Sequence, residues 1–238
     1  MDARHIAAHI VAWAGAVLFA ASLLYFLFSY SVTFGETVDG QLDAGAILVN
    51  VALFSVFALH HSVFARNRVR ELVRGVVPDQ LERSVYVWVA SLMLIGVCYA
   101  WRMVPGLLWQ VPAPWSWGFT AIQLGAVWLT LRSAAVIDGF ELAGLRQVRE
   151  PKSESLEPAP DFKTIGPYGW VRHPIYLGWI LLVFSVGTMT MTRFVFAAVS
   201  TLYLLIAIPL EERTIRANAA TYADYMRRVR WKLIPGVY

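Results

Sequence analysis

The sequence predicts an all-α polytopic membrane protein with about six transmembrane helices, a C-terminal helical hairpin and an amphipathic cytoplasmic tail helix. Three observations predict this class. Hydrophobic residues make up 58% of the 238 residues and charged residues only 15%, whereas a soluble domain has about a quarter charged residues. The apolar residues form long runs, and the basic residues gather between these runs. We therefore expect lipid to be the main solvent of the chain.

Six apolar runs are candidates for membrane spans, because a spanning helix needs about 20 apolar residues. The first four runs meet that length. The last two have about 17 residues each, which is marginal for a full crossing. They are joined by Thr190, Met191 and Thr192, so we expect a tight helical hairpin. The predicted spans are 7–30, 44–64, 85–104, 118–137, 174–190 and 193–210.

We expect the chain to form one membrane domain, residues 1–238. This domain divides into four N-terminal spans (1–137), a cytoplasmic loop (138–173), the hairpin (174–210) and a cytoplasmic tail (211–238). The stretch 105–117 carries three prolines and three tryptophans. It is therefore expected to be a non-helical outer loop with aromatic rings at the membrane interface.

The positive charges predict the orientation in the membrane. Seventeen of the 20 Lys and Arg residues fall on one side of the predicted spans and two on the other, while Arg132 lies within a span. Basic residues collect on the cytoplasmic flank of membrane proteins. We therefore expect both termini in the cytoplasm. The same bias explains the net charge of +4 without a nucleic-acid partner.

Several residues of reactive types carry no predicted chemistry. Cys98 is the one cysteine and lies in an apolar run, so it is expected to be a small buried residue. His60 and His61 are neighbours, and neighbours on a helix face different ways. No partner ligands are spaced around them, so we predict no metal site. His61 is expected to make a polar contact.

The first candidate site lies where the fifth span begins. Residues 166–178 read GPYGWVRHPIYLG, in which a turn precedes aromatic, basic and imidazole groups. Pro174 is well tolerated at a first helical position. His173 is then at the mouth of the helix, where free backbone N–H groups favour an anion. An anchor in which Arg172 extends to the membrane interface explains the same residues equally well.

Two adjacent acids, Glu211 and Glu212, end the predicted sixth span. The hairpin should bring them to the level of Arg172 and His173. Ionisable groups at such depth are costly and are usually paired or functional. A compact polar pocket and a structural salt bridge from Arg172 to a glutamate are both consistent with this. The tail 222–235 predicts a basic amphipathic helix on the membrane surface, or a lid over the pocket.

These residues resemble the isoprenylcysteine carboxyl methyltransferase superfamily, which includes phospholipid methyltransferases and NnrU-like proteins. The similar pattern is G-x-Y-x-x-V-R-H-P-x-Y-x-G at 166–178, E-E at 211–212 and Y-x-x-Y-x-x-x-V at 222–229. Upstream, HSVFAR at 61–66, LERSVYV at 81–87 and GLRQV at 144–148 resemble the bacterial methanethiol S-methyltransferase branch.

The resemblance implies a methyltransferase that uses S-adenosylmethionine. Glu211 then pairs with the ammonium of this cofactor, and the start of the fifth span takes its carboxylate. Tyrosine rings offer their faces to the sulfonium or the adenine. The cofactor contacts implied by the resemblance are Gln147, Tyr168, His173, Pro174, Ile175, Tyr176 and Glu211.

The expected reaction is methylation of a small thiol such as methanethiol. Because the thiolate is the nucleophile, we expect His173 or Glu212 as the base and Arg172 as the group that holds the thiolate. A lipid or isoprenylcysteine acceptor, and a non-catalytic NnrU-like membrane protein, are the alternatives. The isoprenylcysteine enzymes have an arginine four residues before the first glutamate. Ala207 stands there in this chain, which disfavours carboxyl methylation of a prenylated protein.

Overall fold

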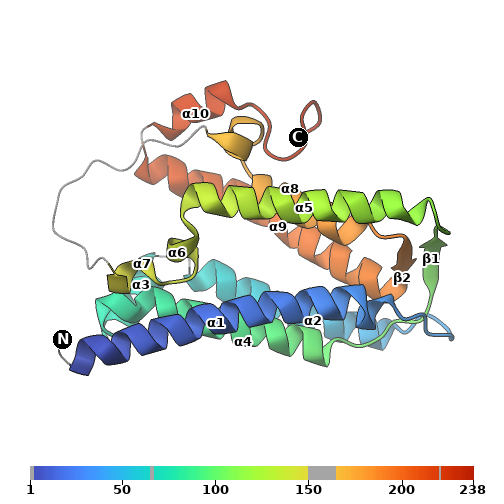
Figure 1. Cartoon of the computed structure of the whole chain (residues 1–238), viewed down its shortest axis with the longest axis horizontal. Coiled ribbons are helices and arrows are strands. Elements are labelled where there is room, and N and C mark those ends of the chain that lie inside the picture. Colours follow the sequence, from blue (N-terminus) through green and yellow to red (C-terminus); the bar gives the residue numbers. More distant parts are fainter. Residues whose placement is uncertain (1–2, 65–66, 150–164, 220) are drawn as a thin grey trace. The chain divides into compact units, whose positions relative to one another are not determined.

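The long apolar runs fold as helices in a computed structural model of the chain, which describes residues 3–64, 67–149, 165–219 and 221–238 (Figure 1). Among these residues, five helices are long and apolar enough to cross a membrane. This confirms the all-α membrane fold class. The five helices are α1 (Ala3–Ser31), α2 (Ala44–Phe64), α4 (Glu82–Ala100), α5 (Ser116–Ile137) and α9 (Met191–Asn218).

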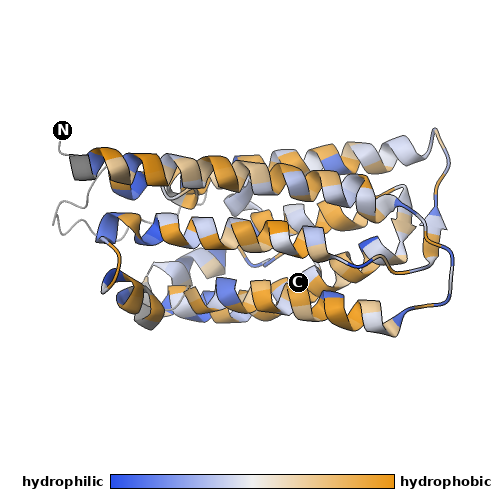
Figure 2. Ribbon diagram, turned by 90° about the horizontal axis from the view of Figure 1, so that it is seen from below, coloured by the Kyte–Doolittle hydropathy of each residue, from blue (hydrophilic) through white to orange (hydrophobic). Residues whose placement is uncertain are grey.

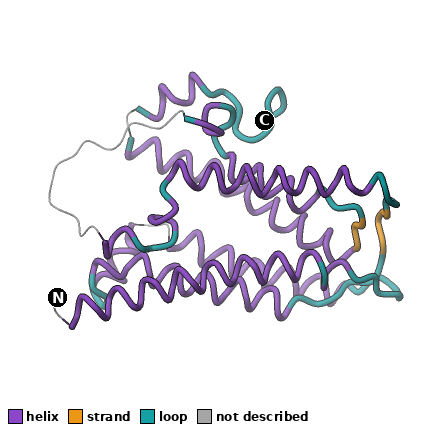
Figure 3. The backbone as a smooth tube through the Cα atoms, viewed as in Figure 1, coloured by secondary structure: helices purple, strands orange, loops and turns teal. Residues whose placement is uncertain are grey.

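Shorter elements connect these helices, and Figure 3 shows a small two-stranded ribbon among them. The short helices are α3 (Asn67–Arg74), α6 (Gly139–Leu142), α7 (Arg146–Arg149), α8 (Pro174–Phe184) and α10 (Tyr222–Arg228). The 3-10 turns are η1 (Thr33–Gly35), η2 (Asp79–Leu81) and η3 (Gly166–Gly169). The strands are β1 (Leu107–Gln110) and β2 (Thr188–Thr190).

The hydropathy of the long helices matches a lipid environment. Figure 2 shows apolar residues along their length and polar residues gathered near their ends and in the connections. In a bilayer core every backbone polar group must be satisfied within the protein, and a helix does this by itself. The chain divides into two compact units, Met1–Gly106 with Gly139–Ser155 and Leu107–Asp138 with Leu156–Tyr238.

In the first unit, α4 packs against both α1 and α2. Close approach of α1 and α4 depends on Gly15, because a Cβ there would lie 2.8 Å from the indole nitrogen of Trp88. That indole donates a hydrogen bond to the carbonyl of Val11 at 3.0 Å. On α2, the fully buried Asn50 donates to the Arg102 carbonyl and accepts from the Arg102 N–H, both at 2.8 Å. This reciprocal pair ties α2 to the segment that follows α4.

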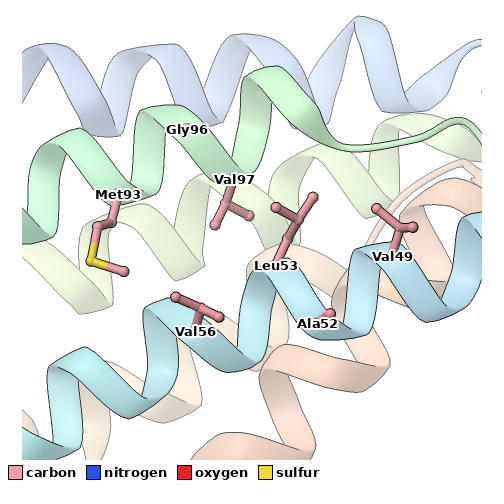
Figure 4. A pocket seen from close by; sticks show the side chains of 7 residues that line it. All are labelled: Val49, Ala52, Leu53, Val56, Met93, Gly96 and Val97. Atoms are coloured by element: carbon pink, nitrogen blue, oxygen red, sulfur yellow. The ribbon is translucent and has the colours of Figure 1, made fainter.

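An apolar groove with a volume of about 440 Å³ lies between α2 and α4 (Figure 4). Every lining side chain is apolar, so the groove offers no hydrogen-bonding group to a polar ligand. The lining residues are Val49, Ala52, Leu53, Val56, Met93, Gly96 and Val97.

In the second unit, α8 packs along α5 and also contacts α9. The contact with α5 requires Gly178, since a Cβ there would overlap the hydroxyl oxygen of Thr130. At the other end of α8 the antiparallel ribbon pairs Leu107 with Thr190 and Gln110 with Thr188. The ribbon anchors the connection between α8 and α9, and so fixes where α8 ends and where α9 starts.

The predicted hairpin has the right position, but its two helices differ from the expected lengths. The chain leaves α8 after Phe184 and forms β2, so α8 has 11 residues instead of the expected 174–190. Helix α9 starts at Met191, where the Thr190 side chain accepts a hydrogen bond from the Arg193 N–H, and it continues to Asn218. Glu211 and Glu212 therefore lie within α9 and not in a tail that follows it. The expected apolar span ended at 210, and the same helix continues beyond it through charged residues to Asn218.

Candidate active site

The candidate site is built around the start of α8. Turn η3 and the segment after it carry Arg172 and His173 to the mouth of the helix, and Pro174 occupies the first helical position. The first helical hydrogen bond is from the Leu177 N–H to the His173 carbonyl at 3.0 Å. The start of a helix carries partial positive charge from its aligned backbone dipoles, and this end of α8 lies at the site.

Arg172 is the most heavily bonded side chain of the site. Its side chain is only 5% exposed, and its Nε donates to Glu212 Oε1 at 2.6 Å. One terminal nitrogen donates to the carbonyls of Val229 and Arg230 at 3.0 and 2.7 Å. The other lies 3.4 Å from Glu212 Oε2. Arg172 therefore joins α9, the segment before α8 and the segment after α10.

His173 lies between the two glutamates. Its Nε2 is 3.2 Å from Glu212 Oε1, and its Nδ1 is 3.7 Å from Glu211 Oε2. A carboxylate only accepts hydrogen bonds, so the Nε2–Glu212 contact requires the ring proton on Nε2. In the neutral ring this leaves a lone pair on Nδ1. The imidazole also stacks on the Tyr176 ring, with centroids 5.3 Å apart and an angle of 11°.

The neighbouring glutamates have different environments. The Glu212 side chain is 6% exposed and its oxygens are engaged by Arg172 and His173. The Glu211 side chain is 43% exposed and accepts a hydrogen bond from the Tyr176 hydroxyl at 2.8 Å. Glu212 therefore belongs to the buried framework of the site, while Glu211 lies at its exposed edge beside Tyr176.

The segment after α9 closes one side of the site. The Arg172 and His173 N–H groups donate to the carbonyls of Trp231 and Lys232, both at 2.9 Å. The Tyr225 hydroxyl donates to the Tyr168 carbonyl at 2.9 Å. Burial raises the pKa of Tyr225 to about 12 and also raises the pKa of Tyr168 and of Tyr222. All three hydroxyls are therefore neutral at physiological pH, and the Tyr225 hydroxyl keeps its donor role.

Six of the seven cofactor residues implied by the sequence lie in the second unit, together with the three expected catalytic residues. Gln147 is the exception, since α7 belongs to the first unit. There the Ser84 hydroxyl donates to the Gly144 carbonyl at 3.0 Å and fixes the chain just before α7. The buried Gln147 Oε1 has no hydrogen-bond partner among the described residues. The expected salt bridge between Arg172 and a glutamate is present, and its partner is Glu212.

The sequence did not reveal the hydrogen-bond acceptors that residues 229–232 provide for Arg172 and His173. Val229, Arg230, Trp231 and Lys232 take part through backbone carbonyls, which no side-chain pattern reveals. The valine that ends the Y-x-x-Y-x-x-x-V pattern was the one available signal.

A polar cluster in the first unit was also not predicted in full. The Tyr86 hydroxyl is 2.5 Å from His61 Nδ1, the His60 ring stacks on Tyr86, and the Arg83 guanidinium lies 4.8 Å from the centre of the same ring. The cluster joins α2 to α4. Tyr86 and Arg83 belong to the LERSVYV motif, and that motif was the signal for them.

The chain is similar to several named proteins. Methanethiol S-methyltransferase 1 of Bradyrhizobium diazoefficiens is 36% identical over 220 residues, which are 90% of this chain and 77% of that protein. Methanethiol S-methyltransferase of Mycobacterium tuberculosis is 36% identical over 227 residues, 88% of this chain and 91% of that protein. Nurim of Xenopus laevis is 30% identical over 187 residues, 73% and 64% of the two chains. No family model and no solved structure matches the chain.

Proposed function

This chain belongs to the methanethiol S-methyltransferase family, and we propose that it is a membrane enzyme that methylates a small thiol such as methanethiol with S-adenosylmethionine. The observation that carries the proposal is the connected series Arg172, Glu212, His173, Glu211 and Tyr176 at the start of α8. In this proposal the membrane is a bacterial inner membrane, and the site opens to the cytoplasm together with both termini.

The side chains at the site fit the charges of S-adenosylmethionine. Its ammonium needs a carboxylate, and the half-exposed Glu211 supplies one that is oriented by Tyr176. Its carboxylate suits the positive end of the helix dipole at the start of α8, which is an 11-residue helix. Tyr168 and the stacked pair of His173 and Tyr176 supply aromatic faces. When bound, this cofactor would supply a methyl group attached to a positively charged sulfur. That sulfur is a good leaving group and needs no proton to depart.

The task of the protein is to orient the two reactants and to remove the proton of the acceptor thiol. We assign His173 Nδ1 as the atom that accepts this proton, because Nε2 already carries a proton and donates it in a hydrogen bond to Glu212. The thiolate made by this proton transfer would be the nucleophile for the methyl group that the bound cofactor would supply. Glu212 orients the ring, and Arg172 holds Glu212 in place. Direct contact between Arg172 and the thiolate stays a prediction.

The proposal is tested with purified, detergent-solubilised protein and methyl-labelled S-adenosylmethionine. Methanethiol, total lipid and a farnesylcysteine analogue are offered in parallel. We expect volatile label from methanethiol, and we expect Glu211→Gln to weaken cofactor binding because it removes the charge that meets the ammonium. Glu71→Gln is the matched control, since Glu71 is an exposed glutamate on α3. Label that appears only in lipid or farnesylcysteine would replace the proposed acceptor, and absence of both turnover and cofactor binding would refute the enzyme.

The role of His173 is tested with thiols of different acidity. General-base catalysis typically contributes about 10²-fold or more, so His173→Gln should lose that factor in kcat/KM with methanethiol. The loss should shrink with an aromatic thiol that is already ionised at neutral pH. An equal loss for both acceptors would show that His173 positions the site without accepting the proton.

A further inference from the structure

The last residues of the chain form a surface that the proposed reaction does not use. It lies on α10 and the segment after it, beside the C-terminal end of α9 (Figure 1). Basic and apolar side chains are exposed together there. We call this surface the tail face, and it consists of Arg227, Arg228, Arg230, Trp231, Ile234 and Val237.

The exposed side chains of the tail face are of the types that favour the headgroup region of a membrane over bulk water or the hydrocarbon core. The apolar side of α10 is turned toward the protein, where Tyr222, Tyr225 and Val229 form a buried cluster. What remains exposed is a group of arginines next to a tryptophan and two aliphatic side chains. Tryptophan prefers the headgroup level of a bilayer, and clustered basic residues beside a membrane bind anionic lipids. Asp224 is the acid on this side, and its carboxylate is paired with Arg227.

The tail face is directly connected to the candidate site. The carbonyls of Val229 and Arg230 accept hydrogen bonds from Arg172, and those of Trp231 and Lys232 accept from the N–H groups of Arg172 and His173. Arg228 is thus one residue away from the backbone that holds Arg172. The arginines of the tail face and the carbonyls that hold Arg172 therefore belong to one short stretch of chain.

We propose that the tail face docks on anionic phospholipid headgroups, and that this docking holds the segment 229–232 against Arg172 and increases methyl transfer. The activity part of this inference rests on the proposed function, whereas the docking part does not. Each basic residue that meets an anionic surface should strengthen docking about fivefold, and added salt should weaken it.

The experiment uses the full chain in lipid nanodiscs of phosphatidylcholine, with and without phosphatidylglycerol. Hydrogen exchange of the backbone amides in 222–232 reports docking, and methyl transfer to methanethiol is measured on the same samples. The test variant is Arg227→Gln/Arg228→Gln, which leaves the segment 229–232 unchanged. Arg102→Gln is the control, because Arg102 is an exposed arginine in the first unit.

In the native chain and the control, phosphatidylglycerol should slow exchange in 222–232 and raise turnover. The double variant should match the native chain in phosphatidylcholine and lose the response to phosphatidylglycerol. Equal exchange in the two lipids would overturn the inference, and so would the same protection from inorganic phosphate added to phosphatidylcholine discs. Slower exchange without turnover in any sample would leave the docking intact and refute the proposed function instead.

Discussion

Removing the Arg172 guanidinium should strongly destabilise the second unit. The change Arg172→Ala removes the donors to Glu212 and to the carbonyls of Val229 and Arg230. Glu212 is 6% exposed at its side chain, so water cannot replace the lost partner without rearrangement. The carboxylate would then be left inside the protein with His173 alone.

The magnitude follows from the burial of both partners. Removing one member of a buried ion pair leaves the other charge without a partner and lowers the unfolding free energy by about 3–5 kcal/mol. We expect that loss for Arg172→Ala. Glu212→Ala should cost a similar amount, because it strands the guanidinium. The double variant removes both charges, so its loss should be smaller than the sum by about 2–3 kcal/mol.

The assay is a double-mutant cycle on the unfolding free energy of the purified protein in one detergent. Arg74 and Glu82 provide the matched control in the first unit, because they form an ion pair in which the Arg74 side chain is 40% exposed. We expect a smaller coupling for that pair, because the Arg74 end is in contact with water although the Glu82 side chain is only 9% exposed. Additivity within about 0.5 kcal/mol for Arg172 and Glu212 would refute the reasoning, since independent sites behave in this way.

Three further predictions test other parts of the fold. Gly178→Ala should lower the unfolding free energy by about 1–3 kcal/mol, because the added Cβ overpacks the contact with α5. Thr130→Ala in the same chain should restore part of that stability in thermal unfolding, because the Thr130 hydroxyl is the group that the Cβ would meet. Tyr225→Phe should cost about 1 kcal/mol. Because the pKa of Tyr225 is raised to about 12, its hydroxyl stabilises the fold fully below the unfolded-state pKa of about 10. That stability is lost as the pH rises toward 12, which hydrogen exchange or fluorescence of the tail segment would detect in the native chain but less in the variant. Asn50→Leu should lower the unfolding free energy by about 2 kcal/mol or more, because it removes the partners of both backbone groups of Arg102. Unfolding in detergent measures this loss, and Asn50→Asp is the comparison because it keeps the acceptor.

The positions of the first four spans were predictable from hydropathy alone. The expected span 44–64 coincides with α2, and the expected 118–137 differs from α5 by two residues at its start. These helices are lipid-facing over much of their length, so the apolar run and the helix have the same limits. No long-range contact was needed to place these two helices, whereas the expected 85–104 runs past the end of α4 at Ala100, after which Arg102 pairs with Asn50.

The ends of α8 and α9 were not predictable in this way, because tertiary contacts decide them. The apolar run continues past Phe184, but a Cβ at Gly187 would lie 2.9 Å from the Ser116 side chain, and the Gly187 carbonyl accepts from the Val111 N–H at 2.8 Å. The chain leaves the helix there to pair with the segment after β1. Helix α9 passes the end of its apolar run because Glu212 has a buried partner in Arg172.

The grouping of Arg172, His173, Glu211 and Glu212 was predictable, since their spacing and the hairpin bring them to one level. The different environments of the two glutamates were not. Consecutive residues on a helix point about 100° apart, and which of them turns inward depends on how α9 is rotated against α8. The structure places Glu212 on the inner side and Glu211 on the outer side.

The bonds from the last residues to Arg172 and His173 have a consequence for protein engineering. All four acceptors in 229–232 are backbone carbonyls, so the hold on Arg172 and His173 depends on where the chain runs and not on which side chains it carries. A fluorescent or crosslinking residue at an exposed position such as Trp231 should leave these hydrogen bonds in place, although it would change the tail face. A one-residue insertion after Arg228 would move every acceptor out of register at once. Spacing is thus the quantity to preserve when this segment is tagged, shortened or grafted.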